Sequence, residues 1–549
     1  MIGLDLKELK SGWMALPLLL GLISYGMVFF NKGLFLDGWF LEGWSKKGTW
    51  KYLKRFTKEV GMPYLYFLHK TISATRCGKC AYNFINVASL IGAAYAASYL
   101  CVQSEMLSFQ ESMLVAALML AYPGQQIACE KSTTQYFLCT LLFYLGAVLN
   151  IESELSNGTE SVLLWIVSLI LLFLSFNMNS LLVYYLGFFI YKIFLVTKAE
   201  EPDLHYNLVL KNGILVFLPL LFWLLKGLLT PKSGYYSEYN SISFRSKRWA
   251  QGLLSLMSEG TFGCYLEAVR WFLKNPIWVI FMIFAMWVGK PLFVVTPAMA
   301  SSGIPLLTFS AILILLAAIP YILVGQPFGT FGWATKNNVL LAFPCALFIY
   351  SAVSIIFKAE VKGFILFALI SGGAIYLVHV YASWISLWAK NLSALKKISE
   401  EKIFKDAAIV EVCDSYPTEL CNRSRPEHWD ISLTYMLAYQ THAVRHFGIV
   451  GNENSNMVSY SRNEIKNKII QTTVPYVLDE IDPSGNQIRV KIEKGVHSWG
   501  DIKIAVKYLL YSAFFPKKLH ALLSKLVKIE TFALTKTSMS TEQKKPAPI

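Results

Sequence analysis

The sequence has few charged residues for its length. Only 15% of its 549 residues are Asp, Glu, Lys or Arg, whereas 55% are hydrophobic. Soluble globular chains carry about 25% charged residues, so this composition excludes a set of ordinary soluble domains. An apolar content of this size needs lipid as its solvent, and the sequence therefore predicts an integral membrane protein.

Cysteine is also scarce, with nine residues that show no regular spacing. This excludes a disulfide framework of the kind that small secreted domains use. Most of the cysteines lie in or beside apolar segments, where we expect reduced thiols that pack as small hydrophobic groups. Cys77 and Cys80 have the spacing of a redox motif or of half a zinc site, but no second such pair exists. Packing at the mouth of a membrane span is their expected role.

Nucleotide-binding signatures are missing from the chain. The sequence contains no Gly-x-x-x-x-Gly-Lys-Ser/Thr loop and no dinucleotide fingerprint that opens a helix after a strand. Energy from a nucleotide, if it is used, would have to come from a partner. We expect no cofactor.

His442 and His446 form the sharpest local motif, because residues four apart share one face of a helix and could clamp a metal ion. A zinc hydrolase of this design would carry Glu directly after the first His, where this chain has Ala443. The two histidines are therefore weak candidate metal ligands. Two solvated or membrane-facing imidazoles are the expected arrangement, and no metal site is predicted.

Eleven apolar runs approach the roughly 20 residues that a helix needs to cross a bilayer. Seven are clear, namely 13–30, 84–102, 214–230, 277–298, 304–324, 339–357 and 363–388. Four are shorter, namely 106–122, 135–150, 161–176 and 180–195. The expected fold is an all-α polytopic membrane protein with ten or eleven transmembrane helices.

Basic residues are concentrated in three stretches that account for the whole formal charge of +15, namely 31–83 with +7, 231–276 with +3 and 391–549 with +5. Lys and Arg in short loops are retained on the cytosolic side. With eleven spans this rule places the N-terminus outside and the C-terminus in the cytosol, at an inner or plasma membrane if the source is bacterial. The exception is a short outer loop with Lys358 and Lys362.

The expected domains are a transmembrane domain over 1–390, a basic cytosolic domain over 391–534 and a disordered tail over 535–549. Helical patterns in the cytosolic domain cover 391–412, 428–450, 463–481, 501–515 and 516–534. A strong turn at 482–486 precedes the alternating Ile488, Val490 and Ile492, which predicts one β-hairpin. The domain should thus be small and mostly helical.

Candidate binding residues follow from these patterns. Lys290, between Gly289 and Pro291, and His379 are ionisable groups inside spans, and such groups often mark an ion path. A second group of candidates consists of basic side chains that could bind anionic lipid head groups or a partner, namely Arg245, Lys247, Arg248, Lys517, Lys518, Lys525 and Lys528.

The glycine-rich segment 325–333 between two spans is a further candidate. It could be a re-entrant or gating loop, although a tight aromatic turn at the membrane surface is the plainer interpretation.

Three classes of function fit these observations. The first is a non-enzymatic scaffold or channel part of a multiprotein assembly, such as a secretion or conjugation apparatus, whose basic tail docks a partner or an acidic substrate. The second is a small-solute transporter or facilitator, and the third is a membrane enzyme that acts on lipid or lipid-linked substrates. Charged residues inside spans are few and paired acids are absent there, so the scaffold is the prediction.

Overall fold

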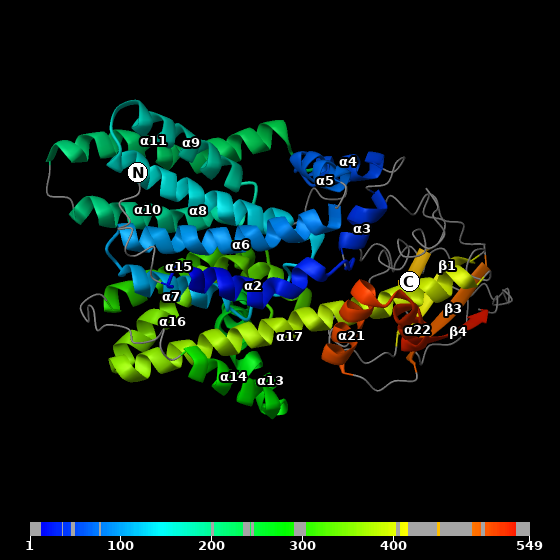
Figure 1. The fold of residues 1–549 in the computed structure, drawn as a ribbon. Helices are drawn as coiled ribbons and strands as arrows, with labels where there is room; N and C mark the ends of the chain where they lie inside the picture. The colour runs from blue at the N-terminus through cyan, green and yellow to red at the C-terminus, as the bar shows by residue number, and fades with distance from the viewer. Residues whose placement is uncertain are drawn as a thin grey trace, which may run out of the picture. The chain divides into compact units, whose positions relative to one another are not determined.

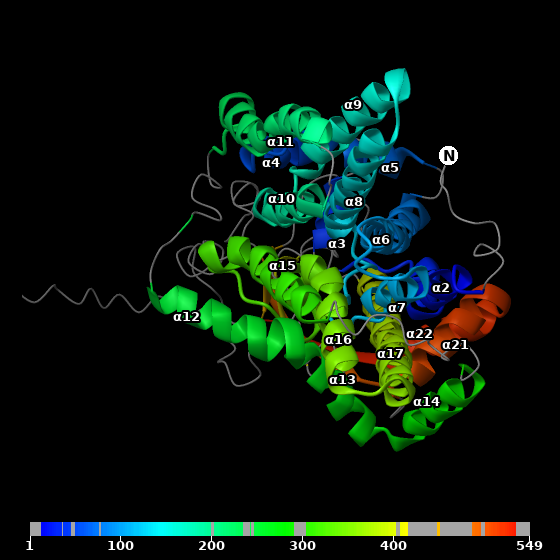
Figure 2. The same cartoon turned by 90° about the vertical axis from the view of Figure 1, so that its left-hand side faces the viewer.

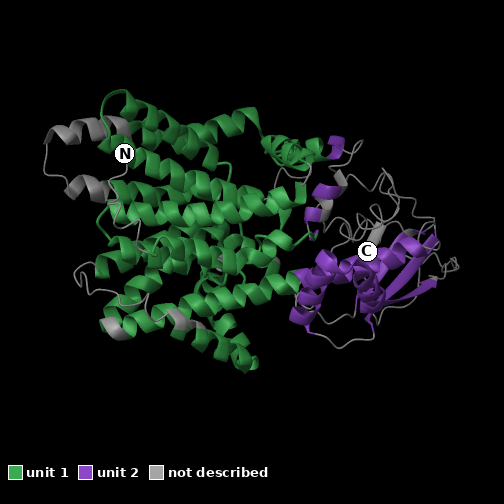
Figure 3. Cartoon of the chain, in the orientation of Figure 1, with its two compact units in different colours: residues 1–33, 53–384 green, residues 34–52, 385–549 purple. Residues whose placement is uncertain are grey.

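The computed structural model describes residues 12–35, 37–44, 50–75, 78–198, 202–233, 242, 246–289, 303–401, 407–414, 447–450, 486–495 and 500–533. The chain forms two compact units, coloured separately in Figure 3. Unit 1 comprises 1–33 and 53–384, and unit 2 comprises 34–52 and 385–549. Each unit is described by itself below.

Unit 1 is a bundle of helices that run alongside one another (Figures 1 and 2). Its longer members are α2 (Ala15–Phe30), α6 (Gly78–Gln103), α8 (Thr134–Leu155), α9 (Gly158–Ser175), α10 (Ser180–Lys198), α11 (Pro202–Leu229), α14 (Pro276–Gly289), α15 (Gly303–Leu323) and α16 (Ala342–Ile356). Shorter ones are α4 (Trp50–Glu59), α5 (Tyr64–Ala74), α7 (Phe109–Leu120), α12 (Ser246–Ser255) and α13 (Phe262–Lys274). The 42-residue helix α17 (Ala359–Glu400) begins in unit 1 and ends in unit 2.

Six of the described helical segments are long and apolar enough to cross a membrane. They are 78–103, 131–155, 158–175, 303–323, 334–356 and 361–400, and four shorter apolar helices accompany them. The chain therefore has the composition of a multi-pass membrane protein. A described helix occupies at least part of every one of the eleven apolar runs.

Helix α7 is too short to be the span that was expected over 106–122. Its 12 residues rise about 18 Å at 1.5 Å each, well below the roughly 30 Å of hydrocarbon. A capping box fixes its start, where the Ser108 side chain accepts from the Glu111 N–H and the Glu111 carboxylate accepts from the Ser108 N–H. Helical structure then ends at Leu120, ahead of Pro123 and Gly124.

Unit 2 contains a four-stranded mixed sheet with the order β2-β1-β3-β4. The strands are β1 (Ala407–Asp414), β2 (Phe447–Val450), β3 (Asn486–Lys494) and β4 (Val527–Ala533). Strand β1 pairs in parallel with β2 and β3, and β3 pairs antiparallel with β4, for example Val490 with Thr531. Ala394 and Ile398 of α17 pack against buried strand residues such as Val410 and Val490 and form the core of this unit.

The sheet corrects four expectations about the C-terminal region, and with them the all-α class. Strands β1 and β2 replace the ends of the helices expected over 391–412 and 428–450. The helix expected over 516–534 is α22 (Pro516–Leu526) followed by β4, and β3 is a central strand rather than half of a local hairpin. Helix α21 (Asp501–Phe514) agrees with the expected helix at that position, and α3 (Asp37–Trp44) also belongs to unit 2.

Candidate functional site

The most unusual part of unit 1 is a buried segment without regular structure between α7 and the 3₁₀ helix η1 (Lys131–Thr133). All ten residues from 121 to 130 are buried, and none is helical. Non-helical backbone at membrane depth is tolerated only where protein covers it or where it lines a water-filled cavity, because lipid offers no hydrogen bonds. The side chains that satisfy this backbone therefore define a site.

Gln126 joins this segment to the glycine-rich loop 325–331. Its amide Nε2 donates to the carbonyl oxygen of Thr330 at 2.9 Å, and its Oε1 accepts from the N–H of Gly332 at 2.9 Å. The indole of Trp384 donates to the main-chain oxygen of Gln126 at 3.0 Å. Phe328 and Gly329 of the loop are buried whereas Gly325 and Pro327 are exposed, so the loop is tied to the bundle at one end and reaches its surface at the other.

Three neighbouring side chains, those of Gln125, Tyr381 and Asn338, complete the connection. Gln125 Nε2 donates to the carbonyl oxygen of Val339 at 3.2 Å, and Tyr381 donates its hydroxyl to the carbonyl oxygen of Gln125 at 2.6 Å. Asn338 Nδ2 donates to the carbonyl oxygen of Gly329 at 2.7 Å. We call residues 121–130 and 325–341 together the buried joint.

Three side-chain amide oxygens at the buried joint accept no hydrogen bond within the part of the chain that the structure describes. They belong to Asn86, Gln125 and Asn338, each of which uses its NH₂ group on a main-chain carbonyl. Buried acceptors of this kind are normally satisfied by water or another donor. A water molecule or a polar solute at the joint would satisfy these three oxygens.

Lys362, which was expected in an outer loop, is paired inside unit 1. Its Nζ donates to the Tyr350 hydroxyl at 2.8 Å and lies 3.7 Å from Glu111 Oε1. The Tyr350 hydroxyl in turn donates to Glu111. Because a carboxylate on α7 neutralises this lysine, its charge is a poor guide to the side of the membrane.

Lys192 on α10 is a second buried cation with a fixed partner. Its side chain is 4% exposed, pairs with Glu154 on α8 and donates to Asn150 Oδ1 at 3.0 Å. Ion pairs of this kind neutralise charge between helices. Lys192 and Lys362 are thus both held by acids on neighbouring helices.

His69 on α5 lies beside the end of the buried joint. Its Nδ1 is 2.9 Å from the hydroxyl of Tyr82, and Lys131 stands over the Tyr82 ring at 5.4 Å from the centroid. Burial, helped by the positive charge of Lys131, lowers the pKa of His69 to about 4. The imidazole is therefore neutral in the folded protein at neutral pH.

This shift predicts a loss of stability in acid. The unfolded chain, with a His pKa of about 6.5, binds the proton before the folded chain does, so stability falls as the pH drops from about 6.5 to 4. The contribution of His69 is at most about 3 kcal/mol. A His69→Gln variant should lose correspondingly less stability between pH 7 and pH 4.5 in thermal unfolding experiments, and an identical loss in both proteins would contradict the assignment.

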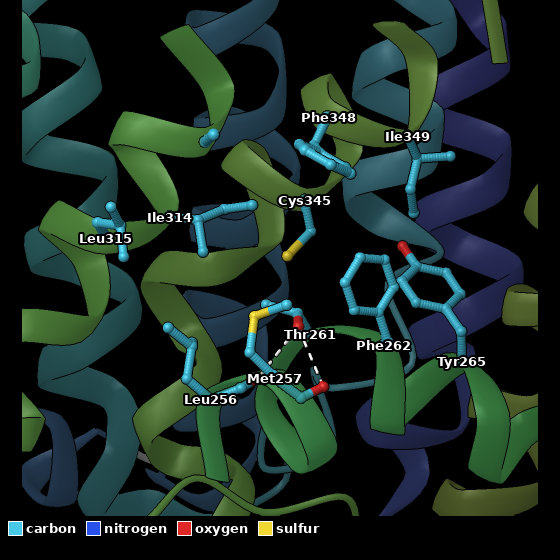
Figure 4. Close-up of a pocket in the computed structure, with 11 residues that line it drawn as sticks. Leu256, Met257, Thr261, Phe262, Tyr265, Ile314, Leu315, Cys345, Phe348 and Ile349 are labelled. Carbon is cyan, nitrogen blue, oxygen red and sulfur yellow. Dashed lines mark hydrogen bonds between the residues drawn. The ribbon is translucent and has the colours of Figure 1, made fainter. Parts of the chain in front are cut away.

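A cavity of about 220 Å³ lies on another side of unit 1, between α15, α16 and a π-helical turn, η3 (Leu256–Thr261) (Figure 4). The turn contacts the buried joint, because the Tyr122 hydroxyl donates a hydrogen bond to the carbonyl oxygen of Gly260. π-Helical turns frequently occur at functional sites. Sequence periodicity gave no sign of this turn.

The structure places the predicted site residues as follows. His379 is buried and stacks on Trp271 with ring centroids 4.5 Å apart. Lys247 and Arg248 lie on α12. Lys290, Arg245, His442 and His446 lie outside the described residues. None of these residues takes part in the buried joint described above.

The described cysteines differ in state. Cys101, Cys129, Cys139, Cys264, Cys345 and Cys413 are buried free thiols. Cys80 is disulfide-bonded, so the expectation of a reduced thiol is wrong there.

Unit 2 presents the four lysines that were predicted for one helix face. Lys517, Lys518 and Lys525 lie on α22 and are exposed. Lys528 instead lies on β4, where it pairs with Glu530 and lies 4.0 Å from Glu493. The basic face of α22 is thus shorter than the sequence indicated.

Comparison with protein-family models, with curated proteins and with solved structures finds no match to this chain.

Proposed function

We propose that this chain is a non-enzymatic membrane component of a multiprotein assembly and that its C-terminal unit docks an acidic partner. The observation that carries the proposal is an apolar stripe on α21 that stays exposed and is followed directly by lysines. The stripe consists of Val506, Leu510 and Phe514, and we call it, with Phe515, Lys517 and Lys518, the docking face.

Helix α21 has two different sides. Ile504, Ala505 and Tyr508 are buried in unit 2. On the opposite side, Val506, Leu510 and Phe514 are spaced four residues apart and are 42%, 48% and 70% exposed. Contiguous exposed apolar side chains with a polar rim mark interaction sites. A partner that covers the stripe would bury this apolar surface, and the burial would contribute favourable binding free energy.

The rim of the stripe is positively charged. Lys517 and Lys518 are exposed at the start of α22, and the Lys518 ammonium lies 4.8 Å from the centroid of the Phe515 ring. Charges at a rim select partners of opposite sign and speed their association. An acidic surface with an apolar centre is the complement that this face requires.

The face is also held in place. Ser386 on α17 donates to Asp501 Oδ1 at 3.0 Å, and the Trp388 indole donates to the Tyr508 hydroxyl at 3.1 Å. Ser393 donates to the carbonyl oxygen of Leu523 on α22. A surface fixed by such contacts loses little conformational entropy on binding.

The interior of unit 1 supports the non-enzymatic part of the proposal. Lys192 and Lys362 stand in fixed pairs with acids, and the joint is tied by side-chain hydrogen bonds. A transporter is the second candidate, which the unsatisfied amide oxygens of the joint favour. In either case we place the C-terminal unit in the cytosol, because the loops and tail richest in Lys and Arg fall on that side.

A single substitution tests the docking proposal. Phe514→Glu puts a negative charge in the centre of the stripe without touching the buried side of α21, so copurification of specific partners from native membranes in mild detergent should fall at least tenfold. Ser512→Glu is the matched control, because Ser512 is exposed on the same helix but points away from the stripe. It should leave the partners bound.

Three results would overturn the proposal. Partners retained equally by Phe514→Glu would show that the stripe is not the contact. If the unmodified protein and both variants are purified alone and monodisperse, transport becomes the favoured function. Loss of binding to anionic vesicles without loss of any protein partner would show that the face contacts the leaflet instead.

A further inference from the structure

The cavity beside the π-helical turn is built almost entirely from apolar side chains. Leu256 and Met257 come from the turn, Ile314 and Leu315 from α15, and Phe348 from α16 (Figure 4). These are among the most apolar helices of the chain, and 303–323 and 334–356 are both long enough to cross a membrane. The occupant must therefore be largely apolar.

The mouth of the cavity opens on the outer surface of the bundle. Met257, Phe262 and Leu315 line it and are still 51%, 45% and 46% exposed. Leu315 lies on α15, which is long and apolar enough to cross a membrane, and side chains exposed on such a helix face lipid. The cavity can therefore be filled sideways from the bilayer.

One polar group in the wall is left without a partner. The hydroxyl oxygen of Tyr265 is buried and makes no hydrogen bond within the described chain, and the ring stands next to Phe262 in the wall. The other hydroxyl in the wall, that of Thr261, donates to the carbonyl oxygen of Leu256 at 3.0 Å. A buried phenol normally finds an acceptor, and an occupant with an oxygen atom near its apolar part would supply one.

We propose that this cavity binds one acyl chain of a membrane diacyl lipid, with an ester carbonyl oxygen that accepts a hydrogen bond from Tyr265. The volume of about 220 Å³ is below the roughly 300 Å³ at which sites for whole drug-sized ligands begin. It suits a segment of one chain, while the head group stays in the membrane surface. The site lies in unit 1 and is independent of the docking face.

The cavity can be filled from one position in its wall without changing a polar side chain. Ala311 on α15 lines the cavity, so Ala311→Phe should fill it. Tyr265→Phe keeps the shape and removes only the donor. Val162→Phe on α9 is the control, because Val162 is 52% exposed and lies away from the cavity wall.

The experiment uses the full chain in nanodiscs that contain a diacyl phospholipid with a diazirine on one acyl chain, and the labelled peptides are mapped after illumination. We expect labels within 256–265, 311–315 and 345–349, a loss of at least fivefold with Ala311→Phe, and no change with Val162→Phe. Unchanged labelling in Ala311→Phe would overturn the site.

A competition measurement tests the role of Tyr265. Unlabelled diacyl lipid should compete several times better than its dialkyl ether analogue, which lacks the carbonyl oxygen, and Tyr265→Phe should abolish this preference. Equal competition by both lipids in the unmodified protein would overturn the hydrogen bond. If Ala311→Phe does not fold, the competition alone decides.

Discussion

Replacing Glu111 with Ala should lower the free energy of unfolding of unit 1 by about 3 kcal/mol or more, the usual cost when one partner of a buried ion pair is removed. Glu111 has two roles. Its carboxylate completes the capping box of α7, and it also accepts a hydrogen bond from the Tyr350 hydroxyl close to Lys362. The Lys362 side chain is only 12% exposed, so its charge would be left in a poorly solvated position.

The double variant separates the two roles of Glu111. Lys362→Met removes the stranded charge, so the Glu111→Ala, Lys362→Met pair should recover part of the loss and leave the capping cost of about 1 kcal/mol together with the cost of the Tyr350 hydroxyl, which loses its acceptor. The measurement is thermal or denaturant unfolding in one detergent for the two single variants and the double variant. Strictly additive losses would contradict the pairing of these residues.

Gly373→Ala should be among the most damaging changes of a single methyl group, with a loss of roughly 1–3 kcal/mol from overpacking. A Cβ atom at Gly373 on α17 would lie 2.0 Å from the carbonyl oxygen of Ala121, the first residue of the buried joint. The contact is with backbone, so no side chain can rotate away. The joint itself would have to shift.

Its neighbour provides a matched control. A Cβ atom at Gly372 would meet Met282 Sδ at 3.5 Å, which is ordinary contact. Gly372→Ala should therefore keep the helix-propensity gain of up to about 1 kcal/mol. Unfolding of the two variants in the same detergent gives the comparison, and equal stability of the two would show that α17 does not approach Ala121 closely.

The apolar helices of unit 1 could be predicted from the sequence because hydropathy reports directly on the solvent that a helix needs. The failure at α7 has a local cause. Ala121 and Tyr122 continue the apolar run beyond the end of α7, so hydropathy extends the span through residues that the structure leaves non-helical. Pro123 and Gly124, followed by Gln125 and Gln126, were the available signal for a buried break.

The sheet of unit 2 was harder to predict because its pairing is not local. Val410 in β1 lies opposite Ile488 in β3, far along the chain. The strand also carries Glu411, which is fully buried and pairs with Arg489 at 2.6 Å. A charged residue at a buried position breaks the alternation of polar and apolar residues on which strand prediction relies.

The glycine-rich segment 325–333 of the buried joint was a candidate from the sequence, but the segment 121–130 and the cavity were missed, for a related reason. In the sequence, charged residues and histidines were the candidate site residues. The buried joint is instead connected by the side chains of Gln, Asn, Tyr and Trp residues. The cavity beside η3 is lined by apolar residues and one phenol. Such side chains are common in any membrane protein. Their spatial grouping, and not their identity, makes them a site.

The central claim, that the docking face receives an acidic protein partner, is tested most directly by cross-linking from the face itself. A photoreactive amino acid is placed at position 510, or at position 512 as a control, in the full chain, and native membranes are illuminated. We expect one specific protein adduct from position 510 and none from position 512. Adducts to lipid alone from position 510, or identical adducts from both positions, would contradict it.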